Sequence, residues 1–413
     1  MKKIFVDAVL GFLFVLSIIL FFSSITYFRI FDIFDPIGDM FEDFEFTDLV
    51  MSQMREAPPA DENILLVNIG ELDRIGIAQQ LQIISRYNPA IIGVDVLLDS
   101  PKDPYQDSVF AATLDTVPNV VLATKMLYNP HTDSFDSLLK PIPAFLPQTE
   151  LAHVNLITGA GNQDEMKVCR SFTPSEQIED SLLMALSVRM AQVIDPVRVD
   201  KFLQRSRSEE LINFRGNVFD YGATEYGTRY FALDVQDVLF ENFVPEIVEG
   251  KIVIFCFLGE YFGDRNTRED IFFTPLNKKY VGKTEPDMFG GVIHANIVSM
   301  ILNEDYLEQM GEKTAKFWAL LLGFINVFFF TIIYKSLPNW YDGITKILQL
   351  LQVLILITIM VYVLHYYNYK IDFSYAIIII LLAGDSIEVY HGVVKNLFSK
   401  RGRRELTTVR KIF

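Results

Sequence analysis

Cysteine and histidine are scarce in this chain of 413 residues, which has two cysteines and five histidines. So few cysteines exclude a disulfide-rich scaffold and a zinc site built from cysteine alone. Cys169 and Cys256 allow at most one disulfide bridge, and two free buried thiols are the alternative that the sequence leaves open. The spacing of the histidines fits no zinc-binding helix, so we expect no metal site.

The chain also lacks the short motifs that mark common catalytic sites. It has no GxxxxGK[ST] phosphate loop, no GxGxxG after a strand, no GxSxG nucleophile elbow and no HExxH. Acyl and phosphoryl transferases usually carry one of these motifs. We therefore expect no enzymatic activity and no cofactor.

Positive charge is in short supply, with 36 basic against 52 acidic residues and a net charge of -16. This balance argues against a protein that binds nucleic acid through a basic surface. The segment 393–413 is the exception, because its seven basic residues against Glu405 give it a charge of +6. Disorder is excluded as well, since 51% of the residues are hydrophobic and 35 are phenylalanine.

Long apolar runs are abundant. Four segments are apolar over 18 to 22 residues, close to the roughly 20 residues that cross a bilayer, and they are 4–22, 317–334, 347–364 and 373–394. Lys2 and Lys3 precede the first run and no small-residue cleavage site follows it, which indicates an uncleaved signal anchor. The chain then divides into four parts: a transmembrane anchor (1–28), a large domain (29–313), three transmembrane helices (314–394) and a short basic tail (395–413).

Lysine and arginine decide the orientation of these helices. Lys2 and Lys3, the loop with Lys335 and Lys346, and the basic tail all fall on one side of the membrane. By the positive-inside rule that side is the cytoplasm. Both termini are then cytoplasmic, and the large domain is extracytoplasmic.

The large domain alternates short apolar runs with segments of helical periodicity. Strands are expected at 64–69, 91–94, 120–123 and 252–258, and shorter extended pieces near Val154 and Val168 and at 211–214. Helices are expected at 75–87, 109–114, 180–193, 235–240 and 293–302. This alternation predicts an α/β fold with a mainly parallel sheet covered on both faces. Aromatic residues at helical spacing over 28–44 predict a stalk helix that packs on the domain.

Acidic side chains follow several of these strands, where ligands bind in open α/β sheets. Glu71 follows the first strand, Asp95 and Asp99 follow the second, and Glu260 and Asp264 follow the strand 252–258. One crevice would bring these carboxylates together, and their mutual repulsion would favour a cationic ligand. Solvated loop carboxylates are the alternative reading. The glycines at 290–291 open a helix that carries the further candidates His294 and Asn296, and the backbone N–H groups at its start can receive an anion. A tight turn explains the glycines equally well.

The fourth apolar segment carries ionisable groups. Asp385 and Glu388 share one helical face, and His391 continues it. Charged groups inside a membrane usually serve a function, which here is contact with a partner helix. Alternatively, the hydrocarbon ends near Asp385 and the rest begins a cytoplasmic helix, as the nearby Lys395 suggests.

Several segments of the large domain, in order, resemble the second type of CHASE domain, an extracellular sensor module of bacterial cyclases and histidine kinases. They are FTDLVMSQMR, NILLVNIG, PAIIGVDVLL, DSVFAATL, KIVIFCFLG, REDIFFTPL and PDMFGGVIHANIVSMIL, spread over residues 44–307. Three closing transmembrane helices also fit that family. Asp107 and Asp270, in DSVFAATL and REDIFFTPL, are further candidate ligand residues. Where the family has an Asp at the end of the first strand, this chain has Gly70 and then Glu71.

The resemblance implies a receptor in the bacterial cytoplasmic membrane, with its sensor domain in the periplasm. Members of the family usually continue into an enzymatic output domain, and none follows here, so we expect signalling through a separate cytoplasmic or membrane partner, with a homo-oligomer as a further expectation. A non-catalytic subunit of an envelope complex is the alternative. A transporter is the weakest candidate, because no inverted repeat of hydrophobic segments is found.

Overall fold

The computed structural model describes residues 2–24, 46–55, 61–147, 149–158, 168–178, 181–218, 230–264, 267–277 and 285–395. The chain forms two compact units. One comprises Met1–Asp39 with Glu308–Phe413, and the other comprises Met40–Leu307. We call them the membrane unit and the α/β unit. The stalk helix expected at 28–44 and the basic tail beyond Lys395 lie outside the described residues.

A seven-stranded sheet forms the centre of the α/β unit. Its order is β11-β1-β12-β2-β3-β4, and β5 also pairs with β3. The bounds are β1 (Ile64–Asn68), β2 (Ile91–Val94), β3 (Val120–Asn129), β4 (Ser134–Leu139), β5 (Glu150–His153), β11 (Phe231–Leu233) and β12 (Ile252–Cys256). All pairings are parallel except that of β3 with β4. The mainly parallel sheet predicted from the sequence is therefore confirmed.

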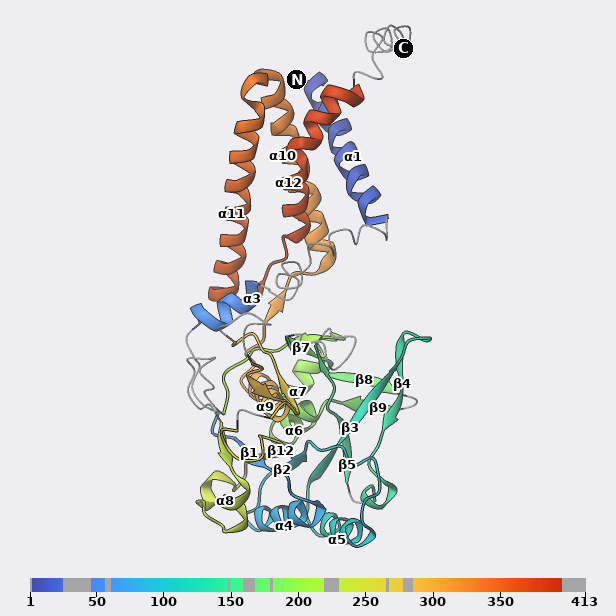
Figure 1. Ribbon diagram of the computed structural model, residues 1–413, viewed down its shortest axis with the longest axis vertical. Helices are drawn as coiled ribbons and strands as arrows, with labels where there is room; N and C mark the ends of the chain where they lie inside the picture. Colours follow the sequence, from blue (N-terminus) through green and yellow to red (C-terminus); the bar gives the residue numbers. More distant parts are fainter. Residues whose placement is uncertain are drawn as a thin grey trace. The chain divides into compact units, whose positions relative to one another are not determined.

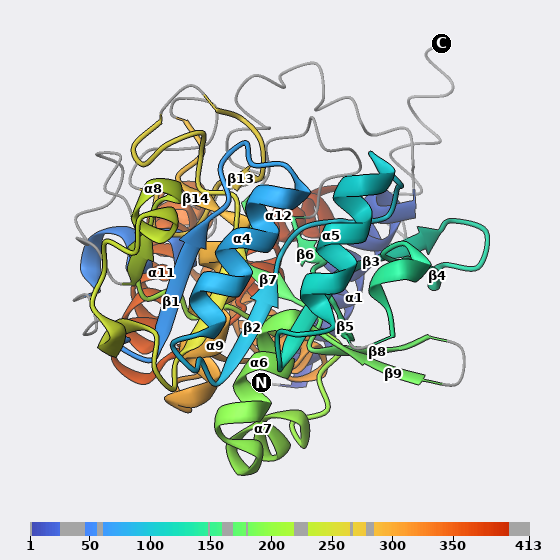
Figure 2. The ribbon, with the colours of Figure 1, turned by 90° about the horizontal axis from the view of Figure 1, so that it is seen from below.

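Helices cover both faces of this sheet, as Figure 2 shows. On one face lie α4 (Arg74–Ser85), α5 (Pro104–Leu114) and α8 (Val235–Leu239); on the other lie α6 (Leu186–Ile194), α7 (Pro196–Leu203) and α9 (Gly290–Leu302). Alternate strand residues explain the two layers. Val94 and Phe255 join the core under α4 and α5, whereas their neighbours Gly93 and Cys256 meet α6 and α9.

Local sequence fixes where these helices begin. Asp73 caps α4 by accepting a hydrogen bond from the Gly76 N–H at 2.9 Å. Asp103 caps α5, with Pro104 at its first position, and Asp234 forms a capping box with Asp237 at the start of α8. Side-chain caps of this kind satisfy backbone N–H groups that have no partner within the helix.

The helix expected at 180–193 was wrong in its first part. Residues Ser181–Met184 form strand β9, which pairs antiparallel with β8 (Ser175–Ile178), and α6 begins only at Leu186. Asp180 and Ser181 are residue types that favour a helix start, but Leu182 to Met184 pair with β8 instead, and the hairpin satisfies their backbone groups. The extension of β3 to Asn129 and its pairing with β4 also went unpredicted.

Short elements complete the α/β unit. The small strands are β6 (Leu156–Ile157), β7 (Ser171–Phe172), β10 (Glu210–Leu211), β13 (Ile271–Phe272) and β14 (Met288–Phe289), and the short helices are α3 (Phe46–Leu49), η2 (Val50–Met54), η3 (Pro143–Phe145) and η4 (Pro245–Ile247). Strand β14 runs directly into α9, so its pairing with β13 sets the start of that helix.

The membrane unit contains four helices that are long and apolar enough to cross a membrane. They are α1 (Lys2–Ser24), α10 (Glu312–Ser336), α11 (Tyr341–Tyr367) and α12 (Ser374–Val389), the last continued by a π-helical turn η6 (Tyr390–Val394). The short helix η5 (Pro338–Trp340) joins α10 to α11, and β15 (Glu308–Gln309) pairs with β16 (Tyr369–Lys370). Figure 1 shows these helices labelled along the chain.

Small and polar residues hold the membrane helices together. Gly323 of α10 leaves room for Ile379 of α12, since a Cβ there would come within 2.4 Å of the isoleucine side chain. The Tyr341 hydroxyl donates to the Gly384 carbonyl at 2.7 Å, and the Gln349 amide donates to the Ile380 carbonyl at 2.7 Å. Close backbone approach and interhelical hydrogen bonds are the usual basis of helix association in lipid.

Candidate functional site

The parallel strands of the central sheet all end at one edge. The registers place Asn68 beside Cys256, Val94 beside Phe255, and His153 beside Thr124. Asp95 follows β2, and its N–H donates to the Phe255 carbonyl at 2.8 Å. Asp95, His153 and Cys256 therefore lie at the carboxyl edge, where open α/β sheets bind ligands.

The N-terminus of α9 lies against this edge. A Cβ on Gly291 would stand 2.3 Å from the Cys256 sulfur and 3.8 Å from an Asp95 carboxylate oxygen. A Cβ on Gly290 would stand 2.7 Å from the Asp270 carboxylate, and the Gly290 N–H donates to the Asp270 carbonyl at 2.9 Å. The two glycines thus let the positive end of the helix approach both carboxylates.

Two buried histidines complete the cluster. The His294 Nε2 atom lies 4.0 Å from Asp95 Oδ2, and its Nδ1 atom has no hydrogen-bond partner within the described residues. His153 is fully buried, and neither of its ring nitrogens has a hydrogen-bond partner within the same residues. Buried polar groups without partners are uncommon in folded proteins, so these two call for an explanation. We call Asp95, His153, Cys256, Asp270 and His294 the edge cluster.

Burial favours the uncharged form of every group in the edge cluster except Asp270, which is exposed. It raises the pKa of Asp95, which the nearby His294 opposes, and it raises the pKa of the Cys256 thiol well above its usual range. Burial lowers the pKa of His294 and brings the pKa of His153 down to about 3. Such shifts are common at functional sites because they make protonation sensitive to small changes nearby.

The remaining candidate ligand residues lie on exposed loops or make other contacts. Glu71, Asp99 and Glu260 are exposed on loops, and Asp264 is buried after β12. Asp107 lies on α5 and pairs with Arg74 of α4, on the opposite face of the sheet from α9. Asn296 points its side chain at the backbone of 215–216.

Sequence reasoning missed two members of the edge cluster as ligand candidates, His153 and Cys256. His153 ends a strand whose place beside β3 follows only from the sheet order. Asn68 was missed too: its amide accepts from the Gly70 and Leu258 N–H groups at 3.0 and 2.9 Å. This asparagine therefore ties together the loops that follow β1 and β12.

Residues 18–334 match the family model of the CHASE2 domain, which covers more than half of the chain. The chain belongs to the CHASE2 family. CHASE2 is a family of sensor domains linked to signalling, in agreement with the resemblance seen in the sequence. No curated protein and no solved structure matches the chain.

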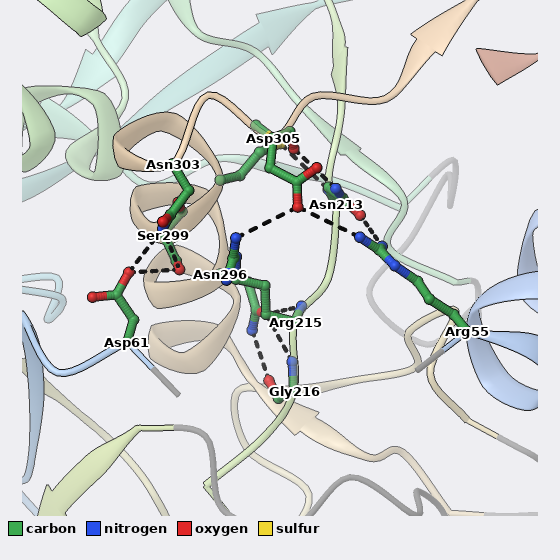
Figure 3. A network of polar contacts seen from close by, with 10 residues as sticks. Arg55, Asp61, Asn213, Arg215, Gly216, Asn296, Ser299, Asn303 and Asp305 are labelled. Carbon is green, nitrogen blue, oxygen red and sulfur yellow. Dashed lines mark hydrogen bonds and ion pairs between the residues drawn. The ribbon is translucent and has the colours of Figure 1, made fainter. Parts of the chain in front are cut away.

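A second polar network of the CHASE2 domain surrounds the other half of α9 (Figure 3). Asp61 accepts hydrogen bonds from the Ser299 hydroxyl at 2.7 Å and the Asn303 amide at 3.2 Å. Asp305 pairs with Arg55 and Arg215, each at 3.5 Å. Further contacts are those of Arg55 with Asn213 and of Asn296 with the backbone of Arg215 and Gly216. The network includes Arg55, which ends the first described segment of the α/β unit, and Asn303 and Asp305, which closely precede the boundary with the membrane unit at Leu307.

One of the two charged residues of α12 forms an ion pair within the chain. The Lys346 ammonium donates to Asp385 at 2.6 Å, so Asp385 pairs with α11 of the same membrane unit. Glu388 is exposed. Contact of these residues with another protein stays a prediction, and the pairing of Asp385 with Lys346 is a competing role for it.

The disulfide considered from the sequence is not formed. Cys169 and Cys256 are both free and buried, and burial raises the pKa of each thiol, to about 12 for Cys169. Within the described residues no group of three or more His, Cys, Asp or Glu side chains is arranged to hold a metal ion.

Two free thiols give a direct test. Titration of the full chain with 4,4′-dithiodipyridine in urea, without reductant, is expected to release two equivalents of thiopyridone. Without urea the reaction is expected to be at least about a hundredfold slower, since both sulfurs are reached only when the α/β unit opens. A titre near zero in urea would mean that the bridge forms after all.

Proposed function

We propose that this CHASE2 chain is a receptor in the bacterial cytoplasmic membrane whose α/β unit lies in the periplasm and reports an external stimulus to a separate partner protein. Membership of a sensor-domain family carries this proposal. The four membrane-length helices support it, as does the position of Lys2, Lys3, Lys335 and Lys346 on one side of the spans, which favours cytoplasmic termini.

The edge cluster is the candidate site that receives the stimulus. Asp95, Asp270 and His294 come from three separate segments, so a ligand that contacts all three would fix those segments relative to one another. The His294 side chain is buried and that of Asp95 is largely covered, whereas Asp270 is exposed, so a ligand would reach the cluster from the side of Asp270. A cationic ligand fits best, because a nearby positive charge stabilises ionised carboxylates that are otherwise costly to bury.

The network of Figure 3 is the candidate route from this site to the chain segments that lead into the membrane unit. Helix α9 carries His294 in its first half and Ser299 in its second, so a shift of the helix reaches both ends. Asp305 lies two residues before the end of the α/β unit at Leu307, and it pairs with Arg55 of the first described segment of that unit. A ligand acts through such a route only if it binds one arrangement of the helix more tightly than another.

Replacing Asp95 with asparagine tests the receiving site. Compounds that raise the Tm of the wild-type full chain in detergent, found by scanning a panel of small cations and amines, are expected to lose at least 80% of that shift in Asp95→Asn, because asparagine cannot ionise to pair with a bound cation. Asp99→Asn, an exposed carboxylate four residues away, is the matched control and keeps the shift. Equal shifts in wild type and Asp95→Asn would rule out the edge cluster as the site.

Co-purification tests the signalling role. The full chain, crosslinked in cells and extracted in mild detergent, is expected to carry a cytoplasmic or membrane protein with a cyclase, kinase or related output domain, identified by mass spectrometry. Stoichiometric recovery with large envelope proteins would instead support a structural subunit. We expect Asp305→Ala to reduce recovery of the partner while leaving ligand-induced Tm shifts in place, since Asp305 lies in the network and outside the edge cluster.

A further inference from the structure

A basic cavity lies at one end of the membrane unit. It has a volume of about 510 Å³ and is lined by Lys2, Lys3, Phe5, Val6, Asp7 and Lys395. Ligand sites commonly have volumes of roughly 300 to 1,000 Å³. The cavity belongs to α1 and the end of η6, and it shares no residue with the edge cluster.

Asp7 organises the positive charge around this cavity. The carboxylate is buried, and its two oxygens take different lysines: Lys395 at 2.6 Å on one and Lys335 of α10 on the other. One carboxylate of α1 thus binds two ammonium groups, one near the end of α10 and one directly after η6. With Lys2 and Lys3, four lysines stand against this single acid, a net charge of +3 for the group.

Apolar side chains stand directly beside these lysines. Phe5 and Val6 are each 53% exposed and line the same cavity. At the end of a helix long enough to span a bilayer, exposed apolar groups face acyl chains and adjacent lysine ammonium groups reach the level of the lipid headgroups. A free inorganic anion would contact only the lysines. A phospholipid would contact the lysines through its headgroup and Phe5 and Val6 through its acyl chains.

We infer that this cavity binds the phosphate of an anionic phospholipid, with Lys2, Lys3 and Lys395 around the headgroup and Phe5 and Val6 against its acyl chains. Lysine binds phosphate as a mobile point charge, and basic pockets between membrane helices are known to hold acidic lipids. Asp7 is a positioning residue. It holds Lys395 in place, but its own negative charge repels a phosphate. The bound lipid would join α1 to the end of α12, independently of any stimulus at the edge cluster.

The test uses the full chain in nanodiscs of dioleoyl phosphatidylcholine with 20 mol% dioleoyl phosphatidylglycerol. Native mass spectrometry of the released protein counts the lipids that stay bound. Wild type is expected to retain phosphatidylglycerol about tenfold or more above its share in the bilayer. Each lysine near a membrane surface contributes about fivefold to the binding of acidic lipid, so Lys3→Gln with Lys395→Gln lowers this enrichment about 25-fold or until no enrichment is left.

Lys346→Gln is the matched control. This lysine lies near the start of α11, at the same end of the unit, but it pairs with Asp385 and does not line the cavity. Lys3→Gln alone leaves both ion pairs of Asp7 intact, so it keeps the test valid if the double variant fails to fold. An equal loss of enrichment in Lys346→Gln, or no enrichment in wild type, would overturn the site.

A second arm separates a lipid from a free anion. Inorganic phosphate at 10 mM and glycerol 3-phosphate at 10 mM are expected to leave the enrichment unchanged within about twofold, because neither contacts Phe5 or Val6. Displacement of the lipid by either one would mean that the cavity takes a soluble phosphate and that the lipid assignment is wrong.

Discussion

Replacing Gly291 with alanine is expected to lower the free energy of unfolding of the α/β unit by about 3 kcal/mol, at the upper end of what extra atoms in a packed interior usually cost. The added methyl group would stand 2.3 Å from both the Cβ and the sulfur of Cys256. Cys256 ends the buried strand β12, paired with β1, so its Cβ cannot withdraw without moving the strand. Helix α9 would have to shift away from the carboxyl edge.

Urea unfolding of the full chain in detergent measures this effect. Both cysteines lie in the α/β unit, so their reaction with 4,4′-dithiodipyridine reports the opening of that unit alone. The reaction of Cys169 is followed in every variant, including those that lack Cys256. The urea midpoint of Gly291→Ala is expected to fall, and an unchanged midpoint would contradict the close approach of α9 to β12.

Two further variants decide whether the contact itself is responsible. Cys256→Gly empties the space that the new methyl group needs, so Gly291→Ala is expected to cost much less in the Cys256→Gly background than in wild type. Gly93→Ala is the comparison on the same sheet face. Its methyl group would meet the Met190 sulfur at 2.4 Å, in a long side chain that moves easily, so we expect a loss of about 1 kcal/mol or less.

The sheet was predictable where its signals are local. The strand expected at 91–94 is β2 itself, and the strand expected at 252–258 contains β12. Such runs are apolar throughout because a central parallel strand is buried on both faces. The sheet order is not local: β12 comes more than 150 residues after β2, yet it separates β2 from β1. No short-range pattern encodes that insertion.

The same distinction explains the candidate site. Asp95 was found because it directly follows a strand, and the rule that ligands bind beyond strand ends applies to it. His153 reaches the same edge only because β5 pairs with β3, whose other side pairs with β2. Asp107 was also a candidate ligand residue, and it lies in the segment DSVFAATL that resembles the CHASE domain. In the structure it pairs with Arg74 and so stabilises the packing of α5 on α4. Chain order alone does not distinguish these cases.

The membrane helices follow more directly from the sequence, since a bilayer demands long apolar segments whatever the fold. Each of the four expected runs falls on one of the four candidate spans, and none extends beyond its span by more than one residue. In the sequence, Asp7 is only a charged residue that interrupts the first apolar run, 4–22. Its two lysine partners lie 328 and 388 residues further along the chain, and only the packing of the helices brings them to it.

Acid is expected to destabilise the α/β unit through His153. Burial lowers the pKa of this histidine from 6.5 to about 3, with the nearby His294 adding to the shift. Above pH 6.5 the ring is neutral in both the folded and the unfolded chain and contributes nothing to the pH dependence. Below pH 6.5 the unfolded chain binds a proton that the folded chain does not, so stability falls as the pH falls, down to about pH 3.

The size of the effect follows from the shift. At 1.36 kcal/mol for each pKa unit, the loss from His153 reaches about 3 kcal/mol at pH 4. Other buried groups act in the opposite direction: burial raises the pKa of Asp287 to about 7, so its contribution falls as the pH rises between about 4 and 7. A difference between two variants isolates His153, because Asp287 is common to both.

His153→Leu provides that difference. Leucine leaves no ring nitrogen to protonate, and neither nitrogen has a hydrogen-bond partner to lose among the described residues. Urea midpoints at pH 7 and pH 4, measured by thiol reaction, are expected to show that the variant gains about 3 kcal/mol on wild type between the two pH values. His131→Leu, an exposed histidine in the loop between β3 and β4, is expected to follow wild type. Parallel behaviour of wild type and His153→Leu would mean that the buried ring is already protonated or open to water, and the edge cluster would then not be held in its uncharged form.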